Sequence, residues 1–264
     1  MNSQFLERYI AGTSPVHALD ARVKLVLTLA LILCASLLPV GAWLALAGLT
    51  ALVWTAIIVS GVGLGTILRR ALVALPFLAV VITIIFSVPG RPVFQIPLGF
   101  ATLTATDAGL LRFVTIVWKS WLSVQAALLL TATTHFLDVL KALRALRLPA
   151  IMVTLLSFMY RYLFILVEEA QALLRARECR SAALEGKGGG SVWWRAQVTG
   201  QLVGTLFLRA FERSERIYVA MLSRGYTGEL RSLKASQLNP RDRLVGILGS
   251  LALGLIVTQA YLGQ

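Results

Sequence analysis

Five apolar runs of bilayer length alternate with shorter polar segments along this chain of 264 residues. A membrane-spanning helix needs about 20 mostly apolar residues. The chain is 58% hydrophobic and 14% charged, whereas soluble domains carry about a quarter charged residues. The sequence therefore predicts an all-α integral membrane protein with about five transmembrane helices. The five runs lie at residues 23–38, 42–59, 71–88, 110–131 and 244–262.

The basic residues predict how these spans are oriented. Arg69 and Arg70 follow the second run, and 17 of the 25 Lys and Arg residues fall within residues 135–243. Because cytoplasmic loops carry the excess of Lys and Arg, both regions are expected in the cytoplasm. With five spans, the N-terminus is then cytoplasmic and the C-terminus lies outside the cell membrane. Residues 89–107 form an outer loop, whose FATLTAT sequence alternates in the manner of a short strand.

An alternative topology has seven spans, with residues 151–167 and 192–211 as two further crossings. That topology would place Arg175, Arg177 and Arg180 outside the cell, against the charge rule. The preferred reading makes these segments two long amphipathic cytoplasmic helices, joined by the glycine-rich turn EGKGGGS at residues 185–191.

Within this basic region, one sequence pattern occurs twice, forty-four residues apart. The segments EEAQALLRARECRS (residues 168–181) and ERSERIYVAMLSRG (residues 212–225) both have helical periodicity. Glu168 aligns with Glu212, and Arg180 aligns with Arg224. Each arginine precedes a small residue where its helix is expected to end. Exposed arginines at two matched helix ends indicate contacts with a partner.

The sequence carries no pattern typical of catalysis. It lacks a GxxxxGK[ST] phosphate loop, and neither His17 nor His135 has zinc-ligand spacing to other donors. Cys34 and Cys179 are expected to be free thiols. The basic residues are not interleaved with aromatics as in nucleic-acid-binding proteins. We therefore expect neither an enzyme, nor a metal site, nor nucleic-acid binding.

Two cations lie inside the fourth run. Arg112 and Lys119 are seven residues apart and share one helix face. Structural pairing within the helix bundle is the favoured interpretation, and a transport role is the weaker one.

Four stretches resemble the transmembrane T-components of energy-coupling factor transporters. They are SPVHALDARVK at residues 14–24, RALRLP at 144–149, FMYRYLFILVEEA at 158–170 and LFLRAFERSERIYVAMLSRGY at 206–226. In the first stretch Ala21 replaces the usual proline. We expect Asp20 to cap a helix there, with Arg22 and Lys24 holding the inner membrane surface. Within the family, these sequences most resemble CbiQ, the T-component of cobalt and nickel importers.

The resemblance implies that two cytoplasmic helices end in motifs that engage two ATPase subunits. Here the matching triplets are Cys179-Arg180-Ser181 and Ser223-Arg224-Gly225, with Arg177 as a flanking contact or rival arginine. ATP and Mg are then bound by the partner ATPase, and this chain holds no cofactor. A separate substrate-binding S-component, with a small accessory membrane subunit, completes the implied complex.

These expectations divide the chain into three parts. Residues 1–133 form a membrane domain, residues 134–241 a cytoplasmic coupling-helix domain, and residues 242–264 a final transmembrane helix. The predicted function is a scaffold that transmits ATPase closure to the S-component of a cobalt or nickel importer. Alternatives are the T-component of a vitamin importer, or, in a different class, a stand-alone secondary transporter or channel.

Overall fold

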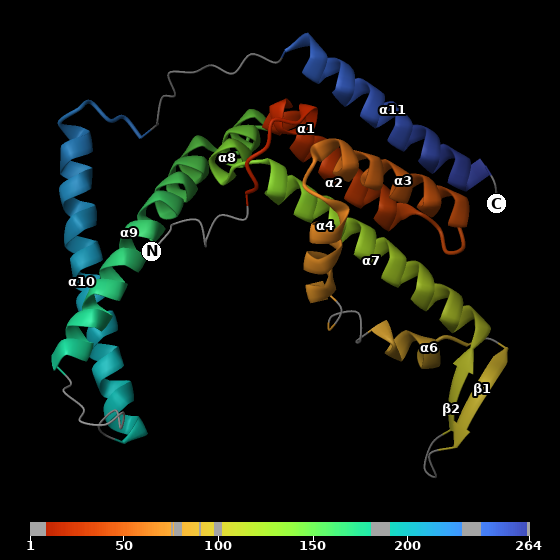
Figure 1. Cartoon of the computed structure of the whole chain (residues 1–264), viewed down its shortest axis with the longest axis horizontal. Coiled ribbons are helices and arrows are strands. Elements are labelled where there is room, and N and C mark those ends of the chain that lie inside the picture. The colour runs from red at the N-terminus through yellow and green to blue at the C-terminus, as the bar shows by residue number, and fades with distance from the viewer. Residues whose placement is uncertain are drawn as a thin grey trace. The chain divides into compact units, whose positions relative to one another are not determined.

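The structure, a computed structural model, describes residues 9–74, 76, 81–89, 91–97, 102–180, 191–228 and 239–262. Its contacts divide the chain into two units, Asn2–Leu146 with Ser236–Gln264, and Arg147–Ala235. We call the first the membrane unit and the second the helix pair. The membrane unit holds α1 (Pro15–Ala18), α2 (Ala21–Leu37), α3 (Trp43–Ser60), α4 (Leu64–Ala71), η2 (Leu72–Ala74), α6 (Thr83–Ser87), β1 (Pro92–Pro97), β2 (Thr102–Thr106), α7 (Asp107–Thr133), α8 (Phe136–Ala145) and α11 (Pro240–Leu262). The helix pair consists of α9 (Ala150–Arg180) and α10 (Val192–Leu222) (Figure 1).

Four described helices are long and apolar enough to cross a membrane: α3, α7, α9 and α11. Three of them coincide with expected runs, and α2 coincides with a fourth. The 17 residues of α2 reach about 26 Å at 1.5 Å per residue, close to a bilayer core of roughly 30 Å. The chain is therefore an all-α integral membrane protein. The preferred five-span reading did not count α9, whose first half has the composition of a span.

The expected run at residues 71–88 is not one helix in its described part. Helix α4 ends at Ala71, a 3₁₀ turn follows at Leu72–Ala74, and a turn at Ile82 precedes α6, which begins at Thr83. Pro76 gives the physical reason, because its ring lacks an N–H and clashes with the preceding helical turn. An apolar run with an internal proline was therefore a poor predictor of a continuous helix.

The loop before α7 contains a two-stranded antiparallel sheet. Strand β1 pairs with β2, and the register places Gln95 opposite Thr104. Strand β2 falls within the alternating FATLTAT segment, so the expected extended piece is confirmed. Thr106 ends the strand and caps α7 by accepting a hydrogen bond from the Gly109 N–H at 3.1 Å.

The membrane unit packs α2 against α7, α8 and α11, and it packs α3 against α7 and α11. Leu46 and Leu49 of α3 are fully buried in its core. On the outer faces, by contrast, large apolar side chains are exposed, such as Leu44 at 70% and Leu255 at 69%. A helix that is apolar all round matches a lipid-facing position.

Polar groups between these helices find partners. Trp54 Nε1 donates to Gln125 Oε1 at 3.2 Å, and Trp118 Nε1 donates to Thr50 Oγ1 at 3.0 Å. Both bonds join α3 to α7. Because a lipid environment offers no water, such bonds keep the indole N–H groups satisfied.

The SPVHALD segment forms two successive helix caps. Ser14 caps α1 by accepting from the His17 N–H, and Asp20 caps α2 by accepting from the Arg22 N–H at 2.8 Å. The His17 ring links Ser14 Oγ at 2.7 Å to the Ile10 carbonyl at 3.0 Å. The expected cap by Asp20 is confirmed, and His17 ties this segment together.

Lys24 does not hold the membrane surface as expected. Its residue is only 8% exposed, and its Nζ donates to the carbonyl oxygens of Thr133 at 3.0 Å and His17 at 3.3 Å. Thr133 is the last residue of α7. The unpaired carbonyls and negative dipole end of a helix attract a cation, which explains why Lys24 turns inward.

Lys119 performs a similar task at the end of α2. Its Nζ donates to the Ser36 carbonyl at 3.4 Å and also to the Leu38 carbonyl. Tyr261 Oη of α11 donates to the Leu37 carbonyl at 2.9 Å. Side chains of other helices thus cap the three consecutive carbonyls of residues 36–38, just before the turn that joins α2 to α3. This supports the structural interpretation of Lys119.

We expect Lys119→Met to lower the thermal stability of the detergent-purified chain. The change leaves the carbonyl of Leu38, a buried residue, short of a donor, and an unsatisfied buried group costs about 1–3 kcal/mol. Arg112→Met, at an exposed position of the same helix, should leave the melting temperature unchanged. Loss of transport by Lys119→Met with unaltered melting would instead support an ion-pathway role.

Candidate functional site

Helices α9 and α10 cross as an antiparallel pair (Figure 1). At the crossing, Glu169 of α9 accepts from two arginines of α10: Arg209 Nη1 lies 3.3 Å from Oε1, and Arg213 Nη2 lies 3.4 Å from Oε2. The Glu169 side chain is 16% exposed, so the carboxylate is largely enclosed by the two helices. Each of its oxygens therefore engages a separate guanidinium.

Beside these ion pairs the two helices enclose an apolar groove with a cavity volume of about 240 Å³. Aromatic and aliphatic side chains from the first half of α9 face the second half of α10 across it. The pair makes few other internal contacts, and α10 has no buried residue. The lining residues are Phe158, Tyr162, Ile165, Leu166, Ala210, Arg213, Ser214, Ile217, Tyr218 and Met221.

The crossing relates the two repeated segments by a local two-fold symmetry. Because Glu169 contacts Arg209 and Arg213, residue 168 of α9 lies opposite about residue 212 of α10. These are the aligned glutamates of the repeat. Arg180 and Arg224 each follow their glutamate by 12 residues, or about 18 Å along the helix. The two arginines therefore lie at similar distances from the crossing, in opposite directions.

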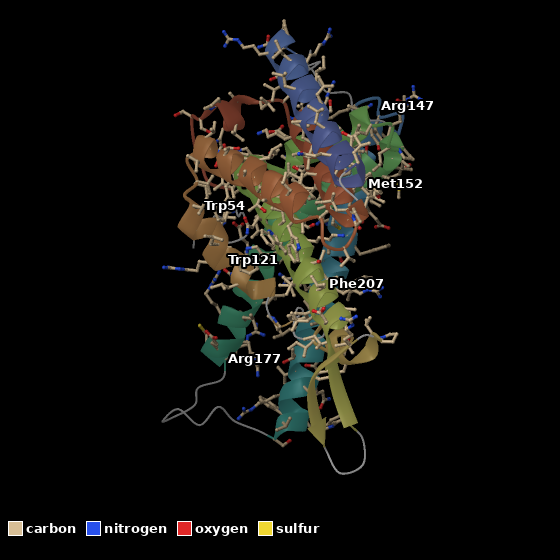
Figure 2. The ribbon with its side chains drawn as sticks, turned by 90° about the vertical axis from the view of Figure 1, so that its right-hand side faces the viewer. Trp54, Trp121, Arg147, Met152, Arg177 and Phe207 are labelled. Carbon is tan, nitrogen blue, oxygen red and sulfur yellow. The ribbon has the colours of Figure 1, made fainter. Side chains whose placement is uncertain are left out.

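The first motif lies in the last turn of α9. Arg180 is the final residue of the helix, and both it and Cys179 are exposed. Arg177, one turn earlier, is half-buried and lies near the end of the helix in Figure 2. Ser181 lies outside the described residues. The more exposed arginine of the two is thus Arg180.

The second motif forms a helix end of the Schellman type. The Tyr226 N–H donates to the Met221 carbonyl and the Gly225 N–H to the Leu222 carbonyl, both at 3.0 Å. Gly225 has φ +78°, a conformation that residues with a Cβ rarely adopt. Arg224 directly precedes this glycine and is exposed. The glycine therefore ends the helix and leaves Arg224 at its tip.

Chemically, the ends of the helix pair offer charge and hydrogen-bond donors. A guanidinium presents several N–H groups in a rigid plane, which suits carboxylates and carbonyls of a partner protein. Within the described ranges, no group of three or more His, Cys, Asp or Glu residues could hold a metal ion. It is the guanidinium donors that suit the site to binding another protein.

Sequence analysis predicted both arginines as site residues, and this stays a prediction, but it did not predict the contacts of Glu169 with Arg209 and Arg213. A signal was present, because Glu169 and Arg213 are also forty-four residues apart and so occupy equivalent positions of the repeat. In an antiparallel pair related by two-fold symmetry, equivalent positions near the axis come together. Opposite charges at equivalent positions could have predicted the contact.

Comparison with known proteins identifies the family of this chain. The family model of the cobalt transport protein CbiQ matches residues 12–235, which include both arginine motifs and the SPVHALD segment. The chain belongs to the CbiQ family. The match to the CbiQ family spans the membrane unit from residue 12 to the end of α8, and both helices of the helix pair.

Named relatives of this CbiQ-family chain include subunits of energy-coupling factor transporters. The chain is 31% identical over 233 residues to the transmembrane protein EcfT of Thermanaerovibrio acidaminovorans, covering 84% of this chain and 83% of the relative. It is 27% identical to EcfT of Thermosediminibacter oceani, covering 97% and 96%. It is 29% identical to the cobalt transport protein CbiQ of Rhodobacter capsulatus, covering 66% and 65%. The chain is thus a membrane component of this transporter type.

We expect Glu169→Gln to loosen the crossing of α9 and α10. The neutral amide keeps the size of the side chain but removes the charge that both arginines share. Spin labels at exposed positions 176 and 205, with Cys34 and Cys179 replaced by Ser, should give a broader distance distribution in this variant. Glu168→Gln, at an exposed neighbour, is the matched control. Equally narrow distributions in both variants would rule out Glu169 as the residue that sets the crossing.

Proposed function

We propose that this chain is the scaffold subunit of an ATP-driven importer and that Arg180 and Arg224 dock two cytoplasmic ATPase subunits. The main support is the symmetry of the helix pair. Two arginines at similar distances on either side of one crossing match the two equivalent surfaces of an ATPase dimer. A stand-alone secondary transporter has no need for this arrangement.

The crossing suggests how force is transmitted. When two docked ATPase subunits approach each other on binding ATP, the two arginine-bearing helix ends are drawn together. Because Glu169 joins α9 to Arg209 and Arg213 of α10, the helices pivot about this point and their other ends move as well. The apolar groove beside the pivot changes shape, and this change is passed to a separate substrate-binding membrane subunit.

Cobalt or nickel is the proposed cargo, in keeping with the family description and with the CbiQ relative. The metal ion is bound by the S-component, helped by a small accessory membrane subunit, while ATP and Mg are bound by the ATPases. We place the N-terminus and the helix pair in the cytoplasm and the C-terminus outside the inner membrane, following the basic residues.

The helix pair also favours the cytoplasmic placement over seven spans. The seven-span alternative requires both α9 and α10 to cross, yet α10 is not among the described helices that are apolar enough to do so. Crossing would also bury Glu169, Arg209 and Arg213 near the bilayer, where charged groups are costly. Only the first half of α9 has the composition of a span, and contact with the membrane or with the S-component accounts for it.

We expect Arg180→Ala and Arg224→Ala each to weaken copurification of the ATPases at least tenfold, with the double variant losing them. Truncating one partner of a buried interfacial charge pair typically costs about 2–5 kcal/mol. Lysine at either position should rescue binding only partly, because a single ammonium does not reproduce the planar donor set of arginine.

Arg177→Ala is the matched control for Arg180→Ala, since both arginines lie in the last turn of α9. An exposed flanking pair contributes about 0–1 kcal/mol. Uptake of radiolabelled cobalt or nickel should therefore stay near normal in Arg177→Ala and fall sharply in Arg180→Ala at equal membrane abundance. The opposite ranking would move the docking arginine to position 177, and normal ATPase binding by the Arg180/Arg224 double variant would reject the proposal.

Orientation is tested by cysteine labelling in intact cells, with Cys34 and Cys179 replaced by Ser. An impermeant maleimide should modify Asp107→Cys, at the exposed start of α7. Gly189→Cys, in the EGKGGGS turn outside the described residues, should react only after the cells are permeabilised. Labelling of position 189 in intact cells would support the seven-span topology.

A further inference from the structure

The membrane unit contains an apolar cavity that the proposed function does not use. Its volume is about 300 Å³, and it lies between α2, α3, α7 and α11, closed at one end by α1. This is about twice the size of the roughly 150 Å³ engineered cavities that stay free of water and bind benzene. Its walls are almost wholly aliphatic, with leucines from all four helices: Leu27, Leu31, Leu52, Leu129, Leu130 and Leu253.

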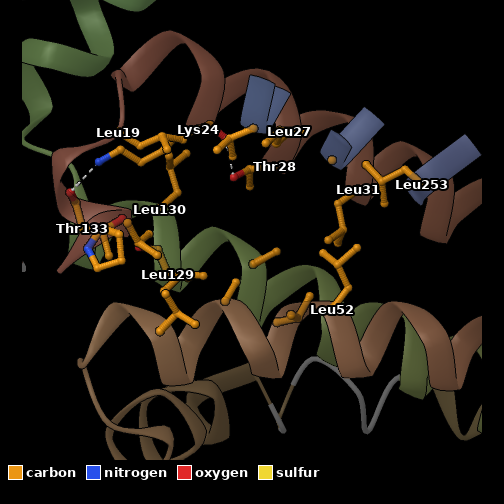
Figure 3. Close-up of a pocket in the computed structure, with 18 residues that line it drawn as sticks. Leu19, Lys24, Leu27, Thr28, Leu31, Leu52, Leu129, Leu130, Thr133 and Leu253 are labelled. Atoms are coloured by element: carbon orange, nitrogen blue, oxygen red, sulfur yellow. Dashed lines mark hydrogen bonds between the residues drawn. The ribbon is translucent and has the colours of Figure 1, made fainter. Parts of the chain in front are cut away.

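One charged side chain lines this cavity. Figure 3 shows the Lys24 ammonium and Thr133 at one end, and Leu31 and Leu253 at the other. An ammonium has three N–H donors, and among the described residues Lys24 uses two of them, on the carbonyls of Thr133 and His17. No carboxylate in the described part of the chain forms an ion pair with it. Asp20, Asp138 and Asp242 attract the ammonium from a longer range, so its third N–H is left for an acceptor that enters this end of the cavity.

The depth of the cavity identifies the side of the membrane that supplies its occupant. Most of the lining residues come from the first half of α2 and of α11, and from the second half of α3 and of α7, while Leu31 and Leu253 lie just past the midpoints of α2 and α11. In the proposed orientation these are the cytoplasmic halves of all four helices. The lipids of the inner leaflet therefore reach this depth, and anionic headgroups bind basic pockets between transmembrane helices on that side.

We propose that this cavity binds one acyl chain of an inner-leaflet anionic phospholipid, with the lipid phosphate accepting the third N–H of Lys24. The aliphatic walls match an acyl chain and offer nothing to a polar metabolite. The acyl chain of the lipid fills space between α2 and α3 that protein side chains leave open. The lipid thus acts as a structural part of the membrane unit, independent of the ATPase-docking helices.

The test compares lipid binding by two alanine variants of α3. Ala56 lines the cavity, whereas Ala51 lies at an exposed position of the same helix. The delipidated full chain in detergent is titrated with dioleoyl phosphatidylglycerol or dioleoyl phosphatidylcholine and examined by native mass spectrometry. We expect one phosphatidylglycerol per chain, at least tenfold weaker binding in Ala56→Phe and unchanged binding in Ala51→Phe.

Three further variants complete the test. Ala126→Leu fills the cavity more gently, in case Ala56→Phe does not fold. Lys24→Met should abolish the preference for phosphatidylglycerol over phosphatidylcholine, while Lys141→Met, at an exposed lysine paired with Asp138, should not.

The proposal is wrong if the folded filled-cavity variants bind phosphatidylglycerol like the wild type. It is also wrong if the wild-type chain does not distinguish the two lipids, or if a fatty acid or a partner's side chain occupies the cavity instead. Since the readout is lipid binding, failure here would leave the ATPase-docking proposal intact.

Discussion

The contact of Glu169 with Arg209 and Arg213 is the interaction on which the geometry of the helix pair depends. Few other groups hold α9 and α10 together, since α10 buries no residue and an apolar groove remains beside the crossing. One enclosed carboxylate between two guanidiniums fixes the point where the helices meet. The distances of Arg180 and Arg224 from that point then follow from helix geometry alone. A partly exposed network of this kind tolerates motion, which a packed leucine interface would resist, and this suits a pivot.

In the membrane unit the equivalent constraint is the satisfaction of backbone carbonyls where water is absent. Lys24 caps the end of α7, and Lys119 caps the end of α2. In both cases a lysine from one helix reaches the C-terminal carbonyls of another, so each bond both closes a helix end and joins two spans. The Gly249 position shows the same tight fit between spans, because a Cβ there would lie 2.7 Å from Leu27 Cδ2. The helices of this unit are therefore held by end caps and by a side chain seated against a glycine, as well as by apolar packing elsewhere.

These particulars explain what the sequence could and could not predict. Apolar length was sufficient for α3, α7 and α11, and local chemistry was sufficient for the Asp20 cap and for the helix end at Gly225. Both features depend on residues close together in the chain. Lys24 was misread as a surface anchor because its partner, Thr133, is more than a hundred residues away. The helix break near Pro76 was not predicted, because hydropathy measures how apolar a segment is and takes no account of the missing N–H of proline.

The repeat and the crossing together account for the arrangement of the candidate site. Two segments that repeat forty-four residues apart produce two-fold symmetry only if they pack antiparallel at equivalent positions, and Glu169 with Arg213 meets that condition. The sequence shows the repeat, but the ion pair is what places its two halves on either side of one axis. The two ends nevertheless differ, since Arg224 precedes a left-handed glycine whereas Arg180 precedes Ser181. Under the proposed function, similar arginines followed by different residues would suit two ATPase surfaces that are related but need not be identical.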